Sequence, residues 1–287
     1  MAEEQVASGL GSPVAGRVGG DAARSQRISD RYYLPVLLAL TLWWAILGYL
    51  VCPLWRKEGS RMDFESLVGA RRSTRGYLDK PVSKELMMEI IDLAQRAPSS
   101  MNTQPWNFHV LTGAPLELVR EGNTERMLAG AAVDREIKMV DHGYQGIHRD
   151  RQVGIAMQLF EAMGIERDDK ERRQDWVMRG FRQFDAPVSV VVTLDAELAD
   201  DTIGHFDCGS ATYGLVLAAT SKGLGCVING QGIMQSSVVR EHGNIPEDEV
   251  IMTCVAMGWP DPDFVANDVV SRRATNVDVA SYVGFES

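Results

Sequence analysis

The segment from residue 83 to residue 111 constrains the fold most, because it contains a helix, a polar loop and a strand in immediate succession. Ser83 is a favoured N-terminal cap, and the apolar residues that follow it recur at the spacing of one helical face. These residues are Leu86, Met87, Ile90, Ile91 and Ala94. Pro98 ends the helix. Residues 106–111 then alternate with the period of a half-buried strand.

The loop between this helix and this strand carries more hydrogen-bonding side chains than a connector needs. They are Ser99, Ser100, Asn102 and Gln104. Amides and hydroxyls can donate to and accept from the edge of a flat heteroaromatic ring. Since loops commonly display binding groups, the sequence predicts a ligand site here.

A second motif precedes the helix, where Arg71, Arg72 and Arg75 surround Ser73. Arginine is permanently charged and presents fork-shaped donors that suit a phosphate better than lysine does. The motif therefore favours an anion-binding cradle. A solvated basic turn at a helix end is the alternative that these residues alone leave open.

With a late Gly258-Trp259-Pro260 and the following Ser271-Arg272-Arg273, the motifs RRSTRGY and PSSMNTQPWNF resemble the FMN-dependent nitroreductase family, over roughly Phe64 to Phe285. The resemblance implies that the FMN phosphate is held by Arg71, Arg72, Ser73, Arg75 and Arg272. It places Pro98, Ser99, Ser100, Asn102 and Gln104 near the ribityl chain or the ring. Bacterial relatives often have a lysine two residues before the late arginine, where this chain has Val270. Arg273 is therefore an alternative late ligand.

A third segment is predicted to belong to the same site. Residues 206–222 have a helical apolar face ended by Gly223, and residues 225–228 are typical of a short buried strand. The resemblance implies that Asn229 and Gly230, which follow this strand, lie against the flavin ring. An ordinary glycine-rich turn is the alternative.

The fold predicted from these elements is α+β, with helices flanking a mixed, mainly antiparallel sheet. We expect its strands near residues 106–111, 188–194, 225–228 and 250–257. The resemblance implies a homodimer with FMN at the interface and residues 271–287 as an arm that reaches the partner. It also implies a mobile helical excursion between Leu116 and Phe184 that sets substrate choice. The alternative for that stretch is a surface helix pair that packs the dimer.

Composition limits the classes of function. The chain has 287 residues, 45% hydrophobic and 24% charged, which suits one catalytic domain, placed at residues 62–287. A net charge of −10 opposes nucleic acid as a partner. The four cysteines form no CxxC pair, so we expect reduced core thiols and no metal site.

The N-terminal part predicts a membrane anchor. Residues 1–30 are rich in Gly, Ala, Ser and charge, which is typical of a disordered arm. Residues 32–55 contain no charged side chain, and at ~1.5 Å per residue such a helix spans a ~30 Å hydrocarbon core. We therefore expect a transmembrane anchor at residues 31–56, with a slight bias of basic residues that favours a cytoplasmic catalytic domain. A buried helix in a water-soluble fold is the alternative.

The expected activity follows from the cofactor that the resemblance implies. NADH or NADPH would reduce FMN, and a small nitroaromatic or quinone-like substrate would then be reduced in a ping-pong cycle. No catalytic side chain is required, and Ser99 and Ser100 lack the G-x-S-x-G elbow of a hydrolase. Reductive dehalogenation of halogenated phenols, as in iodotyrosine deiodinase, is one alternative, and flavin-destroying synthesis of dimethylbenzimidazole is a remoter one. A non-catalytic flavin-binding membrane protein is the third.

Overall fold

The computed structural model describes residues 62–138 and 143–285, which form a four-stranded sheet with flanking helices. The strands are β1 (Trp106–Thr112), β2 (Val188–Asp195), β3 (Gly225–Asn229) and β4 (Glu249–Gly258). Their order is β1-β2-β4-β3, and every neighbouring pair is antiparallel. The α+β class and the strand positions are thus confirmed. The one parallel pairing in the described residues is an isolated bridge between Ser73 and Cys226 beside β3.

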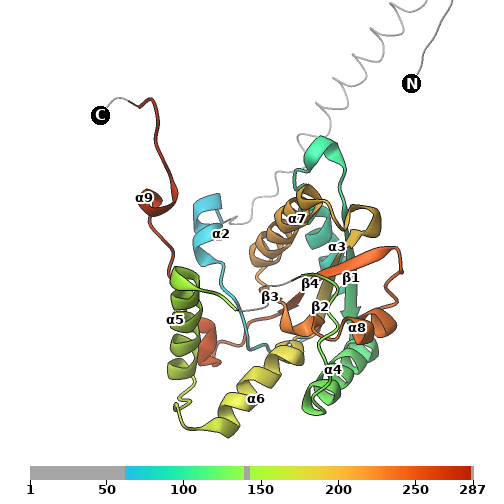
Figure 1. The fold of residues 1–287 in the computed structure, drawn as a ribbon, viewed down its shortest axis with the longest axis vertical. Coiled ribbons are helices and arrows are strands. Elements are labelled where there is room, and N and C mark those ends of the chain that lie inside the picture. Colours follow the sequence, from blue (N-terminus) through green and yellow to red (C-terminus); the bar gives the residue numbers. More distant parts are fainter. Residues whose placement is uncertain (1–61, 139–142, 286–287) are drawn as a thin grey trace, which may run out of the picture. The chain divides into compact units, whose positions relative to one another are not determined.

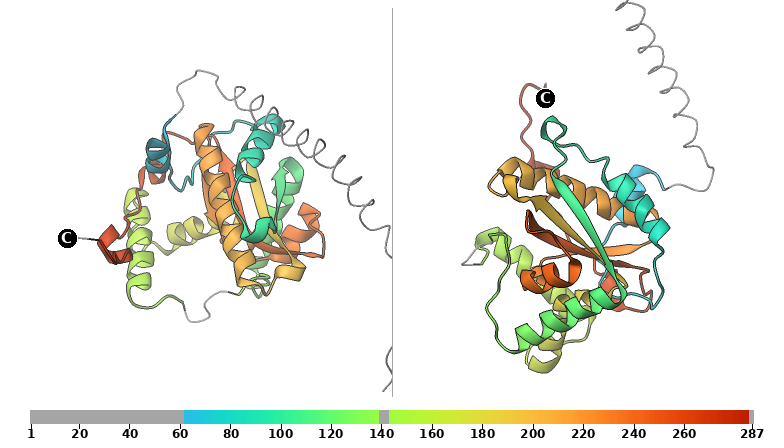
Figure 2. Two further views of the ribbon diagram at one scale, coloured as in Figure 1. Left: turned by 90° about the horizontal axis from the view of Figure 1, so that it is seen from above. Right: turned by 90° about the vertical axis from the view of Figure 1, so that its right-hand side faces the viewer.

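The sheet is covered on both faces, as Figures 1 and 2 show. Helices α3 (Lys84–Ala94) and α7 (Thr202–Ser221) pack on one face, where Val190 of β2 is buried among their apolar residues. Helices α4 (Gly113–Leu128) and α8 (Ser236–Gly243) pack on the other face against Val191. Because alternate side chains of a strand point to opposite faces, β2 is buried on both sides, and its sequence is apolar except for the buried Ser189 and Thr193 and the terminal Asp195.

The helix starts follow from capping side chains. The Ser83 hydroxyl accepts a hydrogen bond from Leu86 N at 3.2 Å, which confirms the predicted start of α3. Helix α7 begins earlier than the predicted residue 206, because the Asp201 carboxylate accepts from Ile203 N at 2.9 Å and caps it there. Gly223 has a φ of +81°, as expected for a left-handed residue after a helix.

The excursion begins later in the chain than the resemblance implied. Leu116 and Val119 of α4 are 1% and 0% exposed and belong to the core. The part that lies away from the sheet consists of α5 (Gly146–Ala162) and α6 (Lys170–Phe181). The short helix α2 (Phe64–Ala70) contacts α7, and in Figure 1 the C-terminal residues with α9 (Asn276–Val279) extend away from the sheet.

The predicted membrane localisation is corrected. Within residues 62–138 and 143–285 no helix is long and apolar enough to cross a membrane, which contradicts the expectation of a single-pass protein with a cytoplasmic catalytic domain. The predicted disordered arm, residues 1–30, and the predicted anchor, residues 31–56, lie outside the described residues.

Candidate functional site

The arginine motif lies along the edge of the sheet. Ser73 forms its bridge with Cys226 of β3, and Thr74 N donates to the carbonyl oxygen of Cys226 at 3.1 Å. A Cβ at Gly225 would overlap the Thr74 side chain, so glycine permits this close approach. The edge of β3 thereby fixes the backbone from which the arginines project.

The same arginines border a cavity of about 610 Å³, which we call the cradle cavity. It brings the early motif together with the late segment of the chain. Its polar and basic lining consists of Arg71, Arg72, Ser73, Arg75, Ser271 and Arg273. Its apolar and aromatic lining includes Val68, Ile155, Tyr213, Val216, Ile228, Val269 and Val270. The volume is within the range of roughly 300–1,000 Å³ that small-molecule sites usually have.

The cradle cavity has an excess of positive charge. In the part of the chain that the structure describes, none of its arginines forms an ion pair with an acidic side chain. Burial lowers the pKa of the Arg75 guanidinium, whose Nη1 donates to the Ser73 carbonyl oxygen at 3.1 Å. A half-buried cation that no carboxylate pairs with among the described residues is costly, and an anion bound here would offset that cost. The donor set and the apolar lining thus fit a ligand with a phosphate and a flat apolar part.

The loop of residues 98–105 lies elsewhere in the same chain. Pro98, Ser99, Ser100, Asn102 and Gln104 are not among the residues that line the cradle cavity. Met101, Asn102 and Gln104 have φ values of 49°, 61° and 48°, and such left-handed residues each cost on the order of 1–3 kcal/mol. Two backbone donors are held by side chains: Gln104 N donates to Ser99 Oγ at 3.0 Å, and Ser100 N donates to Asp207 Oδ2 at 2.8 Å. The loop is therefore strained, exposed and anchored.

The late arginines differ in position. Arg273 lines the cradle cavity, whereas Arg272, the expected phosphate ligand, is not among the lining residues. Arg273 Nη1 donates to Ser271 Oγ at 2.7 Å, which holds the side chain against its own turn. The sequence contained the signal for Arg273, since the two arginines are adjacent in the motif.

The turn after β3 places its two predicted residues differently. The Asn229 side chain is buried, and its Nδ2 donates to the Gly180 carbonyl oxygen at 2.7 Å while its Oδ1 accepts from Gln231 N at 3.1 Å. This amide thus ties β3 to α6. Gly230 faces open space, since a Cβ there would meet nothing within 4 Å. A ring that approached this turn would meet the Gly230 backbone, and the contact of either residue with a flavin stays a prediction.

Helix α6 touches both parts of the candidate site, which sequence reasoning missed. Arg179 Nη2 donates to the Arg75 carbonyl oxygen at 3.1 Å, and its guanidinium lies 5.0 Å from the centre of the Phe264 ring. Through Gly180 the same helix holds Asn229. No periodicity or motif indicates these contacts, because they join residues that lie far apart in the sequence.

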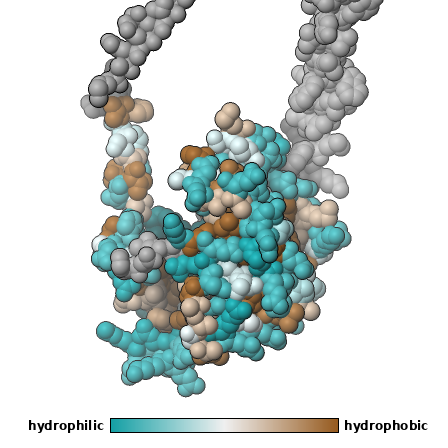
Figure 3. All heavy atoms as spheres, turned by 45° about the vertical axis from the view of Figure 1, so that its right-hand side comes forward, coloured by the Kyte–Doolittle hydropathy of each residue, from teal (hydrophilic) through white to brown (hydrophobic). Residues whose placement is uncertain are grey.

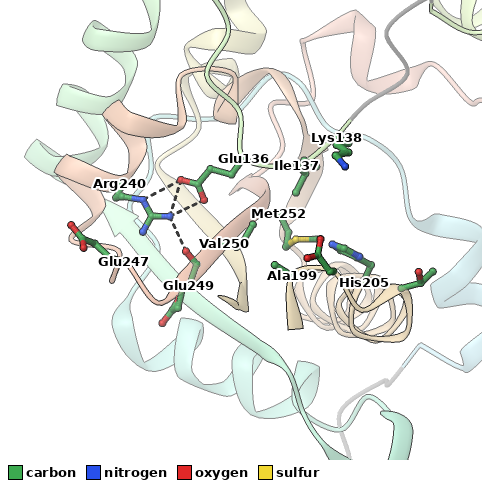
Figure 4. A pocket seen from close by; sticks show the side chains of 12 residues that line it. Glu136, Ile137, Lys138, Ala199, His205, Arg240, Glu247, Glu249, Val250 and Met252 are labelled. Carbon is green, nitrogen blue, oxygen red and sulfur yellow. Dashed lines mark hydrogen bonds and ion pairs between the residues drawn. The ribbon is translucent and has the colours of Figure 1, made fainter. Parts of the chain in front are cut away.

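A second cavity of about 660 Å³ lies over the start of β4, and Figure 4 shows its lining side chains. Arg240 Nη2 donates to both carboxylate oxygens of Glu136 at 2.7 Å and to the Glu249 carbonyl oxygen at 2.8 Å. Glu136 Oε2 also accepts from Ile251 N at 2.7 Å. The arginine is neutralised by its partner, and none of the predicted site residues lines this cavity. We call it the paired cavity.

Comparison with known proteins gives consistent matches. The model of the Nitroreductase family matches residues 68–259. The chain is 32% identical over 221 residues to the chloronitrobenzene nitroreductase of Comamonas testosteroni, and 33% identical over 221 residues to the nitrobenzene nitroreductase of Ectopseudomonas oleovorans. Each alignment covers 76% of this chain and 96% of the relative. Among solved structures, the FMN and NADPH-dependent nitroreductase NfnB from sphigopyxis sp. strain HMH matches with a TM-score of 0.74 and 26% identity, over 78% of this chain and 100% of that one.

Proposed function

The chain belongs to the nitroreductase family, and on that premise we propose that it is an FMN-dependent oxidoreductase that uses NADH or NADPH to reduce nitroaromatic or quinone-like substrates. The observation that carries the proposal is the cradle cavity, in which arginines that pair with no acidic side chain of the described residues surround a space of ligand size. The names of the similar proteins, which are nitroreductases of small aromatic compounds, do not favour a dehalogenase or a non-catalytic flavoprotein.

In this proposal the cradle residues bind and orient the cofactor within the catalytic domain of residues 62–287. Arg71, Arg72 and Arg75, with Ser73 and a late arginine, hold the phosphate by charge-assisted hydrogen bonds. When bound, FMN supplies the hydride chemistry by which a reduced nicotinamide gives its electrons to an electron-poor substrate. Ile228 and Tyr213 line the cavity and offer a flat ring an apolar surface.

A homodimer completes the proposed site. In one chain the loop with Ser99, Ser100, Asn102 and Gln104 does not line the cradle cavity, so we propose that the loop of a second copy supplies these contacts. Exposed apolar side chains on several elements are available for an interface of this kind, since their burial against a second copy would stabilise a dimer. They include Phe64, Met101, Phe206, Tyr213, Ile228, Val277, Tyr282, Val283 and Phe285. On the face drawn in Figure 3, hydrophobic residues are visible between hydrophilic ones.

Sedimentation of the purified full-length chain tests the dimer. We expect the FMN-loaded protein to sediment as a dimer, and dilution that dissociates it to release the flavin. An FMN-loaded monomer would refute the shared site while leaving the cradle assignment intact.

Visible spectroscopy tests the reaction. We expect a yellow protein that is bleached by anaerobic addition of NADH or NADPH and whose colour returns when nitrobenzene is added. Return of the colour with a halophenol alone would instead indicate reductive dehalogenation. A colourless protein that takes up no added FMN would refute the proposed function.

A further inference from the structure

Asp207 is a buried acidic residue in the interior of α7 that the proposed chemistry does not use. Its side chain is 5% exposed, and no basic side chain pairs with it in the described residues. Aspartate is a poor residue for a helix interior, and a buried carboxylate is costly unless it is well hydrogen-bonded. Neither helix stability nor core packing accounts for an aspartate at this position.

The hydrogen bond that the carboxylate makes points to its role. Asp207 Oδ2 accepts from Ser100 N at 2.8 Å, and Ser100 is the first residue of the 3₁₀ turn Ser100–Asn102. Hydrogen bonds to an ionised acceptor are stronger than those between neutral groups. The bond therefore fixes the start of the exposed loop to the rigid helix beneath it.

The loop needs such an anchor because its conformation is strained. Met101, Asn102 and Gln104 all adopt positive φ values, and Met101 is 96% exposed, so its side chain contributes almost no packing in this chain. The bond from Gln104 N to Ser99 Oγ closes the loop on itself but does not attach it to the sheet or the helices. Without the bond to Asp207, we expect the turn to relax toward less strained backbone conformations.

We propose that Asp207 is a positioning residue for FMN: through the Ser100 amide it holds residues 99–104 in the conformation that meets the cofactor. The inference rests on the proposed FMN-dependent function and assigns a role to a residue that itself touches no cofactor. The inference makes a prediction about each of two properties of the loop: its order in the cofactor-free protein and its contribution to FMN affinity.

The test compares Asp207→Ala with a matched control, Asp201→Ala, in the full chain. Asp201 also accepts from a backbone amide on α7, that of Ile203 at 2.9 Å, but it does not touch the loop. In cofactor-free Asp207→Ala we expect amide hydrogen exchange of residues 100–104 to become faster by about tenfold, and the dissociation constant of FMN to rise by about tenfold. Asp201→Ala should lower the melting temperature and leave both quantities within about twofold of wild type.

Asp207→Asn is the conservative variant, and it also serves if the alanine variant does not fold. Its amide oxygen can still accept from Ser100 N, so we expect slower loop exchange and tighter FMN binding than in the alanine variant. Wild-type exchange and wild-type FMN affinity in Asp207→Ala would overturn the inference, and so would faster loop exchange with unchanged affinity. Failure of the proposed function is distinguishable, because it would appear in the wild-type chain as absence of FMN binding.

Discussion

The cradle cavity and the paired cavity have similar volumes, about 610 and 660 Å³, and both contain arginine, yet their electrostatics differ. In the paired cavity Arg240 is neutralised by Glu136, and its remaining donors bind backbone carbonyl oxygens. In the cradle cavity Arg75 lies over an aromatic ring, with its centre 6.0 Å from that of Phe184, and has no carboxylate partner in the described residues. An arginine therefore marks an anion site only where its charge is left uncompensated.

The largest effect should come from removing the uncompensated charges. We expect the double variant Arg72→Gln/Arg75→Gln to bind FMN at least about 100-fold more weakly, because each lost charge-assisted hydrogen bond contributes about 1.5–3 kcal/mol. Quenching of free FMN fluorescence on binding measures this. Arg240→Gln is the matched control from the paired cavity, and an equal loss of affinity there would break the comparison.

In the paired cavity, removal of the arginine should change the free energy of unfolding rather than FMN binding. Arg240→Ala leaves Glu136 without its cation in a half-buried position, and we expect the free energy of unfolding to fall by about 2 kcal/mol. Urea unfolding of the cofactor-free protein measures this. The double variant Arg240→Ala/Glu136→Gln should recover part of the loss, since no charge is then left unpaired. The FMN dissociation constant should not change in either variant.

Two glycine variants distinguish a residue that supports the cradle cavity by packing from a residue that could contact the ligand. Gly225→Ala forces a methyl group against Thr74, so we expect about 1–3 kcal/mol of destabilisation together with weaker FMN binding. Gly230→Ala places the methyl group in open space and should leave stability nearly unchanged. If the flavin approaches the Gly230 backbone as predicted, this variant still weakens FMN binding. Unchanged affinity in Gly230→Ala would remove that residue from the proposed site.

The smallest effect should be on the free energy of unfolding at alkaline pH, and it comes from Cys226, whose backbone pairs with the cradle residue Ser73. Burial raises the pKa of Cys226 from 9.0 to about 12, although nearby Arg71 acts in the opposite direction. The folded protein keeps this proton while the unfolded chain loses it, so the free energy of unfolding falls as pH rises from about 9 toward 12. We expect Cys226 to contribute roughly 1 kcal/mol of this loss by pH 10. Urea unfolding at pH 8 and pH 10 should show a smaller pH-dependent loss in Cys226→Ala than in wild type.

Local sequence signals predicted the elements that carry the site. The Ser83 cap, the alternation in residues 106–111 and the glycine after α7 each correspond to an observed feature, because capping and strand periodicity depend on neighbouring residues. The predicted membrane localisation was wrong. The excursion was placed too early, because Leu116 and Val119 pack on the sheet. Packing against distant elements is not encoded in a local period.

By itself the sequence determined the α+β class, the strand positions and the residue types of an anion cradle, since these depend on composition and spacing within short segments. Only the tertiary structure decided which arginine has no acidic partner among the described residues and which side-chain amide is already hydrogen-bonded. Arg75 and Arg240 are the same residue type, and Glu136 separates their roles from more than a hundred positions away. Asn229 and Gly230 are neighbours, but Gly180 engages only the first. Charge compensation and hydrogen-bond satisfaction depend on which distant groups come within about 3 Å, and that is settled by the folded chain.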